Sequence, residues 1–342
     1  MTMSLDVRGL TVELPTQSGW VRPVNEVSFT LQQGETLGIV GESGSGKTML
    51  SLALMGIAPH GAHCYGEAWL HRREIAGNGN GHDVRNVGAS SPHSSREDLL
   101  ALSEEALREI RGREIAMIFQ EPMTALNPVL RIGAQVEEAI RVHEPKTPAG
   151  EILHRAIAAL ERVSLPDPER RALQYPHQLS GGLRQRVMIA MALAAGPGVL
   201  IADEPTTALD VTVQKKILDL LSKLRCELQL SMLFITHDLG VVAQIADRIA
   251  VMYAGRIVEE GPAAEVLRAP RHPYMEGLLR AAPRLVREKL VPIPGAVPAL
   301  DALPPGCAFA PRCPHHVAEC DIKVPALRAV NKNHGARCIL VV

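Results

Sequence analysis

The chain has 342 residues, of which 46% are apolar, so it can form one large domain with an extension or two modest domains. Aromatic residues make up only 3%, which argues against surfaces that stack nucleic-acid bases or sugars. The formal net charge of −1 does not support a nucleic-acid-binding surface, since such surfaces carry an excess of basic residues. We therefore expect no nucleic-acid partner.

No segment of the sequence is predicted to cross a membrane. Residues 1–10 include two charged side chains and lack the apolar run of a signal peptide. The least polar stretch, 187–202, is interrupted by a Gly-Pro-Gly sequence at 196–198 and is shorter than the roughly 20 apolar residues that span a bilayer. We expect a soluble protein that reaches a membrane through a partner.

The first part of the chain has the pattern of a nucleotide-binding α/β domain. The predicted elements are alternating strands at 5–14 and 27–31, a short apolar strand at 35–40, a helix at 48–55, a polar loop at 77–96, and a helix at 103–111 capped by Ser103. The strand at 35–40 ends at a glycine-rich turn that leads into the next helix. A strand, a glycine loop and a helix in this order begin such a domain.

The remaining elements continue this pattern until the composition changes. They are helices at 131–143, 150–163, 185–195 and 239–246, and buried strands at 115–119, 199–202 and 231–236. The segment 258–267 closes the main domain, and prolines become frequent beyond Pro270. We predict a main domain at 1–265, which contains a mostly helical subdomain at about 121–190, and a C-terminal extension at 266–342.

A complete phosphate-binding loop lies between the strand at 35–40 and the following helix. Its eight positions are Gly41, Glu42, Ser43, Gly44, Ser45, Gly46, Lys47 and Thr48. Glycines let backbone N–H groups face phosphate oxygens, and the helix N-terminus adds the positive end of its dipole. Lys47 supplies a positive charge for the β- and γ-phosphates of a nucleotide, and the Thr48 hydroxyl is a ligand for Mg²⁺. An incidental glycine-rich turn is the alternative, and the match at all eight positions argues against it.

Two acidic residues follow the apolar strand at 199–202. An aspartate at such a strand end, here Asp203, can hold Mg²⁺ through water. Glu204 can accept a proton from the attacking water or polarise it. Because many strands end in solvated charges, this pair indicates catalysis only together with the phosphate-binding loop.

A third motif separates this chain from other P-loop proteins. Its sequence is Leu179-Ser180-Gly181-Gly182-Leu183-Arg184-Gln185-Arg186, and it resembles the signature sequence of the ABC ATPases. At a helix N-terminus, the serine hydroxyl and the glycine amides form an anion site. In that family the site closes over the γ-phosphate bound by the opposite subunit, which the resemblance implies for Ser180, Gly181 and Gly182.

Three more residues match ABC ATPase motifs. Gln120 resembles the Q-loop glutamine that reaches Mg²⁺ and the attacking water, Asp210 ends a sequence (Ala208-Leu209-Asp210) similar to the D-loop, and His237 matches the switch histidine that contacts the γ-phosphate. The resemblance covers about residues 4–325. It implies an α/β fold with a mixed-sheet core, an antiparallel β subdomain and an α-helical signature subdomain, and a site that binds ATP and Mg²⁺. The implied catalytic residues are Glu204, His237 and Gln120.

Two positions depart from the ABC ATPase pattern. Leu14 stands where the family usually has an aromatic residue stacked on adenine, and Trp20 is a candidate substitute across a loop. Leu183 stands at the fifth signature position, where glutamine is commoner. An apolar residue there is similar to the D-type ATPase of peptide permeases, whose F-type partner tends to carry glutamine.

Further stretches resemble the ATPases of dipeptide, oligopeptide and nickel permeases. They are QEPMTALNP at 120–128, the HPY, GLL and proline pattern at 272–283, and GCAFAPRCP at 306–314. The resemblance implies an importer of di- or oligopeptides, with nickel or another small solute as the alternative. The implied partners are two transmembrane permease subunits, a second ATPase of the F-type and an extracytoplasmic solute-binding protein, at the cytoplasmic face of the inner membrane. The loop at 77–96 departs from the family, where a short turn usually stands.

Four of the six cysteines gather near the end of the sequence, at Cys307, Cys313, Cys320 and Cys338. Without an export signal we expect a reducing compartment, which favours a metal site over disulfides. Four thiolates suit a [4Fe–4S] cluster or a tetrahedral zinc ion. The gaps between these cysteines are wider than is usual for zinc, and the family resemblance favours the iron–sulfur cluster. Zinc and four free thiols are the alternatives.

Other classes of ABC protein match the sequence less well. Soluble ABC ATPases of DNA repair or translation commonly have two cassettes in one chain, or a long coiled-coil or zinc insertion. This chain has one cassette, no heptad repeat and no basic excess. An inactive regulatory subunit is opposed by the intact Lys47, Asp203, Glu204 and His237. We expect an active ATPase that works as a head-to-tail pair.

Overall fold

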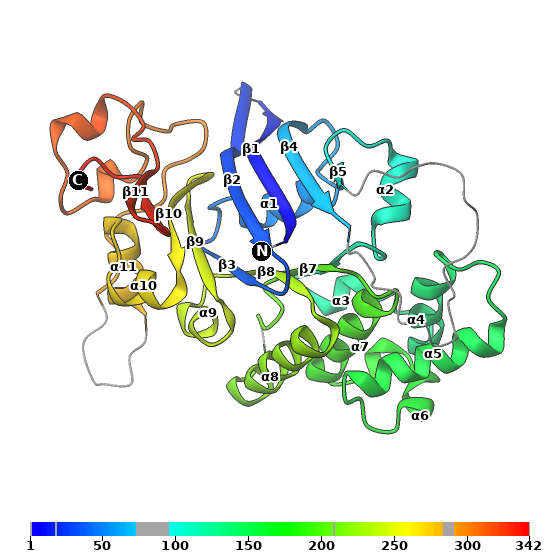
Figure 1. The fold of residues 1–342 in the computed structure, drawn as a ribbon. Helices are drawn as coiled ribbons and strands as arrows, with labels where there is room; N and C mark the ends of the chain where they lie inside the picture. The colour runs from blue at the N-terminus through cyan, green and yellow to red at the C-terminus, as the bar shows by residue number, and fades with distance from the viewer. Residues whose placement is uncertain (1, 18, 73–95, 208, 283–290, 342) are drawn as a thin grey trace.

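The computed structural model contains two β-sheets and a layer of helices beside them (Figure 1). It describes residues 2–17, 19–72, 96–207, 209–282 and 291–341. The predicted loop at 77–96 lies outside these residues except for its last position. Arg96 belongs to strand β5 (Arg96–Asp98), where it pairs with His71 and its guanidinium lies 4.0 Å from the centre of the Trp69 ring. The predicted boundary of the loop is therefore wrong by one residue, because this packing extends the strand.

The smaller sheet is antiparallel, with the strand order β2-β1-β4-β5. Its long strands are β1 (Met3–Thr16), β2 (Gly19–Gln32) and β4 (His63–His71). The predicted strands at 5–14 and 27–31 are confirmed as parts of β1 and β2. Leu5 and Val27 belong to the same buried apolar cluster as Leu50 of helix α1 (Lys47–Leu54), so this sheet covers the helix that follows the phosphate-binding loop.

The larger sheet has eight strands in the order β11-β12-β10-β9-β3-β8-β7-β6. The parallel strands are β3 (Thr36–Val40), β6 (Ile115–Ile118), β7 (Val199–Asp203), β8 (Ser231–Thr236) and β9 (Arg248–Tyr253). Strands β3, β6, β7 and β8 are buried along their whole length, which explains the apolar runs that predicted them. The carboxyl ends of β3, β6, β7 and β8 lie at one edge of the sheet.

The helices and short 3₁₀ turns connect these strands. Besides α1 they are α2 (Glu104–Ile110), α3 (Pro122–Ala125), α4 (Ile132–Arg141), α5 (Ala149–Arg162), α6 (Pro168–Ala172), η1 (Pro176–Gln178), α7 (Gly181–Leu193), α8 (Val211–Leu228), α9 (Leu239–Ile245), α10 (Ala263–Arg268), α11 (Pro273–Ala281), η2 (Ala310–Arg312) and η3 (Ala318–Asp321). Ser103 caps α2 as predicted, since its side chain accepts from the Ala106 N–H. The predicted helix at 185–195 begins earlier, at Gly181, because Ser180 adopts the extended conformation of an N-cap. Helix α8 is not among the predicted elements.

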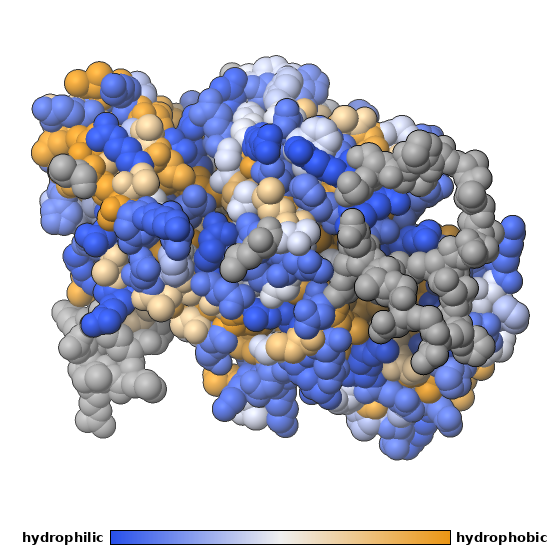
Figure 2. Space-filling model, viewed as in Figure 1, coloured by the Kyte–Doolittle hydropathy of each residue, from blue (hydrophilic) through white to orange (hydrophobic). Residues whose placement is uncertain are grey.

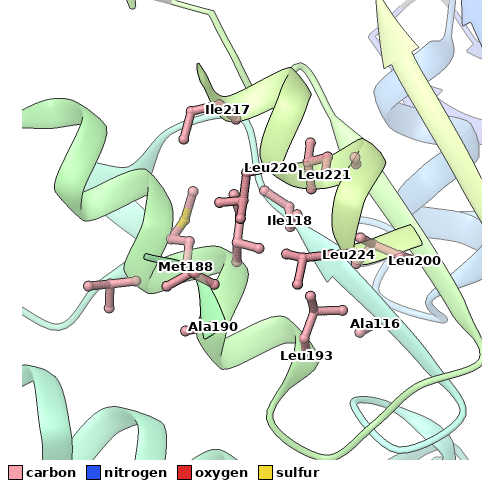
Figure 3. Close-up of a cluster of buried hydrophobic side chains, with 14 of the residues drawn as sticks. Ala116, Ile118, Met188, Ala190, Leu193, Leu200, Ile217, Leu220, Leu221 and Leu224 are labelled. Carbon is pink, nitrogen blue, oxygen red and sulfur yellow. The ribbon is translucent and has the colours of Figure 1, made fainter. Parts of the chain in front are cut away.

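Helices α7 and α8 pack against strands β6 and β7 through apolar side chains (Figure 3). The labelled members of this cluster include Met188 and Leu193 of α7, Leu220, Leu221 and Leu224 of α8, Ile118 of β6 and Leu200 of β7. Each of them is at most 5% exposed. The packing ties the helix that begins with the signature motif to the strand that ends with Asp203.

The C-terminal extension continues the larger sheet. Strand β10 (Arg256–Pro262) pairs antiparallel with β12 (His334–Ala336), which pairs with β11 (Arg328–Asn331). Glu259 of β10 is fully buried, and its carboxylate accepts from His334 Nε2 at 2.7 Å and from the backbone N–H groups of Arg271 and His272. Three donors satisfy this buried acid and hold the extension to the strand before it.

Apolar side chains gather on the surface of the extension, at the upper left of Figure 2. Among the exposed ones are Val317, Ile322, Val324 and Leu340. In the part of the chain that the structure describes, no helix has the length and apolar character needed to cross a membrane.

Candidate nucleotide-binding site

The phosphate-binding loop connects β3 to α1 and is shaped by glycines in close contact with the backbone of other segments. Gly46 has a φ of 103°, and a Cβ atom there would lie 1.9 Å from the Pro23 carbonyl oxygen. A Cβ atom on Gly41 would lie 2.2 Å from the Met252 carbonyl oxygen. Only glycine fits either position, so strands β2 and β9 enforce the shape of the loop from both sides.

Lys47 lies inside this loop, with 5% of its surface exposed. Its ammonium group donates to the Gly41 carbonyl oxygen at 2.8 Å and to the Glu42 carbonyl oxygen at 2.9 Å. Burial lowers the pKa of Lys47, and the charges of Glu204 and Asp203 oppose that shift. The Lys47 ammonium group therefore lies inside the loop that the sequence predicts to bind phosphate.

Asp203 is the last residue of β7 and is 1% exposed. Burial raises its pKa to about 6, although a hydrogen bond from Thr48 and the charge of Lys47 lower it. One carboxylate oxygen, Oδ1, is buried without a hydrogen-bond partner among the described residues. An unpartnered carboxylate oxygen beside a threonine hydroxyl provides the oxygen ligands that Mg²⁺ prefers, so the two residues fit that ion.

Glu204 follows in a left-handed backbone conformation, with a φ of 46°. Its carboxylate accepts from Gln120 Nε2 at 3.2 Å and from Thr207 Oγ1 at 2.8 Å, and His237 Nδ1 lies 3.1 Å from its other oxygen. Burial tends to raise the pKa of Glu204, but the hydrogen bonds with His237 and Thr207 prevail and lower it. Glu204 is thus an ionised base at neutral pH, in contact with the predicted residues Gln120 and His237.

The predicted signature and D-loop residues have contacts at the N-termini of α7 and α8. Ser180 occupies the N-cap position of α7, and a Cβ atom on Gly182 would meet Val213 at the start of α8. The Asp210 carboxylate accepts from the Val213 N–H at 2.9 Å and so caps α8. Within the described residues, no hydrogen bond or ion pair joins Ser180, Gly181 or Gly182 to residues 41–48 of the same chain.

Sequence reasoning missed contacts that support the site. The hydrogen bond from Thr207 to Glu204 could have been predicted, because the two residues are only three positions apart in the sequence. Tyr274 and Arg312 reach Glu42 of the phosphate-binding loop from the C-terminal extension, and no local pattern in the sequence indicates this contact.

The two candidates for adenine stacking differ in their surroundings. Leu14 is half-buried and pairs with Val21 across the β1–β2 hairpin. Trp20 is 53% exposed, and its ring stacks on the His63 ring with the centroids 4.7 Å apart. Trp20 therefore presents an accessible aromatic surface, whereas Leu14 is part of the sheet.

The four C-terminal cysteines line one small cavity together with His272 and His315. Burial raises the pKa of the Cys307, Cys313 and Cys338 thiols. In the ranges that the structure covers, no group of three or more His, Cys, Asp or Glu side chains is arranged to hold a metal ion. The volume of the cavity is about 10 Å³, so the expected iron–sulfur cluster has no preformed site here.

We predict that Asp203→Asn stabilises the fold at neutral pH. The stability that this carboxyl group contributes is fully present below its unfolded pKa of 3.8, and it is lost as pH rises through about 6, because the buried group must then ionise. The free energy of unfolding in magnesium-free buffer should rise by about 2–3 kcal/mol at pH 7.5 and by little at pH 4, as measured by urea denaturation.

The matched control is Asp219→Asn on the exposed face of α8, which should change stability by less than about 0.5 kcal/mol at either pH. An equal gain in the free energy of unfolding at both pH values would show that the gain does not come from ionisation of the buried Asp203 carboxyl group, and would contradict the prediction.

Comparison with known proteins agrees with this geometry. Residues 24–207 match the family model for the ABC transporter domain, and residues 258–320 match the model for the C-terminal region of oligopeptide/dipeptide transporters. A peptide import ATP-binding protein of Brucella melitensis is 51% identical over 343 residues, which cover 98% of this chain and 96% of that protein. Another, from Brucella abortus, is 47% identical over 338 residues, which cover 98% and 94%.

A solved structure shares both sequence and fold with the chain. It is a dimeric ATP-binding cassette in a post-hydrolysis state bound to ADP and Pi, 29% identical with a TM-score of 0.60, and the match covers 76% of this chain and 98% of that one. The loop around Lys47, the acid pair and these matches lead to one conclusion: the chain belongs to the ABC transporter family and is an ATPase of that family.

Proposed function

We propose that the chain hydrolyses ATP to drive the import of di- or oligopeptides. The observation that carries the proposal is the convergence of Lys47, Asp203 and Glu204 at the carboxyl edge of the larger sheet. The peptide assignment is supported by the match at 258–320 and by the names of the Brucella relatives. Import of nickel or another small solute is the alternative, because the cited motifs are shared with nickel permeases.

Each residue of the cluster has a role in this proposal. Residues 41–48 bind the phosphates of ATP, with Lys47 as the cation nearest to them. Thr48, Asp203 and Gln120 hold Mg²⁺, which when bound offsets the negative charge of the phosphates. Glu204 takes a proton from water or polarises it, and Gln120 and His237 orient that water for in-line attack. The lowered pKa of Glu204 keeps its carboxylate able to accept a proton at neutral pH.

Two ATPase subunits act together in this proposal. ATP lies between residues 41–48 of one subunit and the signature residues Ser180, Gly181 and Gly182 of the other, with Asp210 at the same interface. One finding supports it: the similar cassette of known structure is a dimer. The apolar Leu183 favours a non-identical partner of the F-type.

The remaining partners follow from the peptide assignment. We place the chain at the cytoplasmic face of the inner membrane, bound to two transmembrane permease subunits and served by an extracytoplasmic solute-binding protein. The region 124–138, which includes the first part of α4, is the segment that contacts the permease subunits. The division into an ATPase domain at 1–265, with its helical subdomain at 121–190, and an extension at 266–342 is part of this proposal.

The extension holds the four-cysteine cluster, for which we propose a [4Fe–4S] cluster. The proposal is supported by the gathering of all four thiols around one cavity and by the resemblance of residues 306–314 to peptide permease ATPases. Cys307, Cys313, Cys320 and Cys338 are the ligands, and the cavity must widen to admit the cluster. Tetrahedral zinc or four free thiols are the alternatives.

Replacement of Glu204 by glutamine tests the catalytic assignment. We expect phosphate release to fall at least about a hundredfold, because the general base is lost, while MgATP still binds. Lys47→Ala should instead abolish binding of the nucleotide itself. Both are measured by phosphate release and by titration with ATP, with Glu161→Gln on the exposed face of α5 as the matched control. Undiminished hydrolysis by Glu204→Gln would refute its role as the base.

The solute is tested with the partners that co-purify with the tagged chain. We expect the solute-binding protein among them to bind di- or oligopeptides, and vesicles that contain the assembled transporter to accumulate labelled peptide only with ATP. A binding protein that takes nickel chelates and no peptide would contradict the peptide assignment and leave the ATPase assignment intact.

Metal analysis of anaerobically purified protein tests the cysteine cluster. We expect about four irons and four acid-labile sulfides per chain, and their loss in Cys320→Ser. Cys226→Ser, which changes an exposed cysteine outside the cluster, should retain both. Zinc without sulfide, or no metal, would contradict the iron–sulfur proposal.

A further inference from the structure

The C-terminal extension contacts the phosphate-binding loop at Glu42. The Arg312 guanidinium donates to both carboxylate oxygens of Glu42, from Nη1 at 2.7 Å and from Nη2 at 3.0 Å. The Glu42 backbone N–H donates to Tyr274 Oη at 2.8 Å. The Glu42 carbonyl oxygen accepts from Lys47 Nζ at 2.9 Å. Arg312 and Tyr274 of the extension therefore bind Glu42, and the carbonyl group of Glu42 in turn binds Lys47.

Arg312 is fixed in place by its surroundings. Its side chain is 4% exposed, Nε donates to the Pro294 carbonyl oxygen at 2.9 Å, and Nη1 also lies 3.3 Å from Tyr253 Oη. The guanidinium carbon lies 5.9 Å from the ring centres of Tyr253 and Phe309. A planar guanidinium with two parallel bonds to one carboxylate sets the orientation of that carboxylate as well as its distance.

The charge of Glu42 gives this contact a consequence for ATP. A phosphate-binding loop works by presenting N–H groups and a cation to a polyanion, and a free carboxylate in the loop opposes that attraction. Glu42 is also close enough for its charge to act on Lys47. Arg312, which belongs to the extension, neutralises the Glu42 carboxylate and so keeps the electrostatic potential of the loop positive.

We propose that Arg312 is a positioning residue of the ATP site, through which the C-terminal extension sets the affinity of the loop for MgATP. The inference rests on the proposed function of residues 41–48 as the ATP site. Arg312 acts only through Glu42: it cancels the carboxylate charge and, with Tyr274, fixes the peptide group that holds Lys47. Its removal therefore weakens nucleotide binding more than the chemical step.

The test is a double-mutant cycle in the full-length chain. In Arg312→Ala we expect the Kd for a fluorescent ATP analogue with Mg²⁺ and the KM for ATP to rise about tenfold, with kcat within about threefold of the parent. In a Glu42→Gln background, where no carboxylate is left to neutralise, Arg312→Ala should raise Kd by less than about threefold. Arg280→Ala, which removes an exposed pair with Glu276 in the same extension, is the control and should bind like the parent.

Two results would overturn the inference: an equal loss of affinity in both backgrounds, which indicates a general structural role, or no loss in Arg312→Ala. Thermal unfolding shows whether each variant is folded. Arg312→Gln removes the charge but keeps a polar side chain with an N–H donor, and it replaces Arg312→Ala in the cycle should the alanine variant be unfolded. Failure of the unaltered chain to bind MgATP would refute the proposed function, whereas a binding parent with an insensitive Arg312 would refute this inference alone.

Discussion

Lys47 is buried beside the two acids at the end of β7, and the nucleotide site is arranged around this charge. The ammonium group is held by two carbonyl oxygens of its own loop, and the charges of Glu204 and Asp203 oppose the fall in its pKa that burial causes. A buried cation is tolerable only when its partners are fixed, since an unpaired charge in the interior costs several kcal/mol. The partners are fixed here by different elements: the glycine-rich loop, strand β7 and, through Glu42, the C-terminal extension.

The strain at Glu204 is consistent with this arrangement. A left-handed backbone at a residue other than glycine costs about 1 kcal/mol or more and persists only where the surroundings determine it. The Glu204 N–H donates to the Ile235 carbonyl oxygen of β8, and its carboxylate contacts Gln120, Thr207 and His237. The conformation directs the carboxylate toward side chains at the ends of β6 and β8.

The extension shares its core with the nucleotide-binding sheet. One apolar cluster contains Val251 of β9, Tyr274 of α11 and Phe309 near η2, so it crosses the boundary proposed at residue 265. Phe309 also lines the cavity that the four cysteines surround, and its ring lies 5.3 Å from that of Tyr253. Packed aromatic rings and Arg312 thus connect the cysteine cavity to the phosphate-binding loop. The extension is therefore packed into the same structure as the nucleotide-binding sheet.

The sequence by itself determined which local motifs form the candidate nucleotide site, and their chemistry stays a prediction. Residues 41–48 and the acids at the end of β7 could be predicted because each motif is local, and because runs of buried residues mark parallel strands. The strands at 35–40, 199–202 and 231–236 were predicted for the same reason, whereas α8, which carries charged residues on one face, was not.

Only the tertiary structure decided which distant residues meet. Tyr274 and Arg312 contact the site through side chains whose positions depend on the packing of the whole chain, and Arg312 is 270 residues from Glu42. The same holds for the cysteines, whose gathering near the end of the sequence suggested a metal site but whose cavity is nearly closed in this structure. A short sequence pattern predicts the conformation of its own segment. Contacts between distant segments depend on the packing of the whole chain, and a short pattern does not predict that packing.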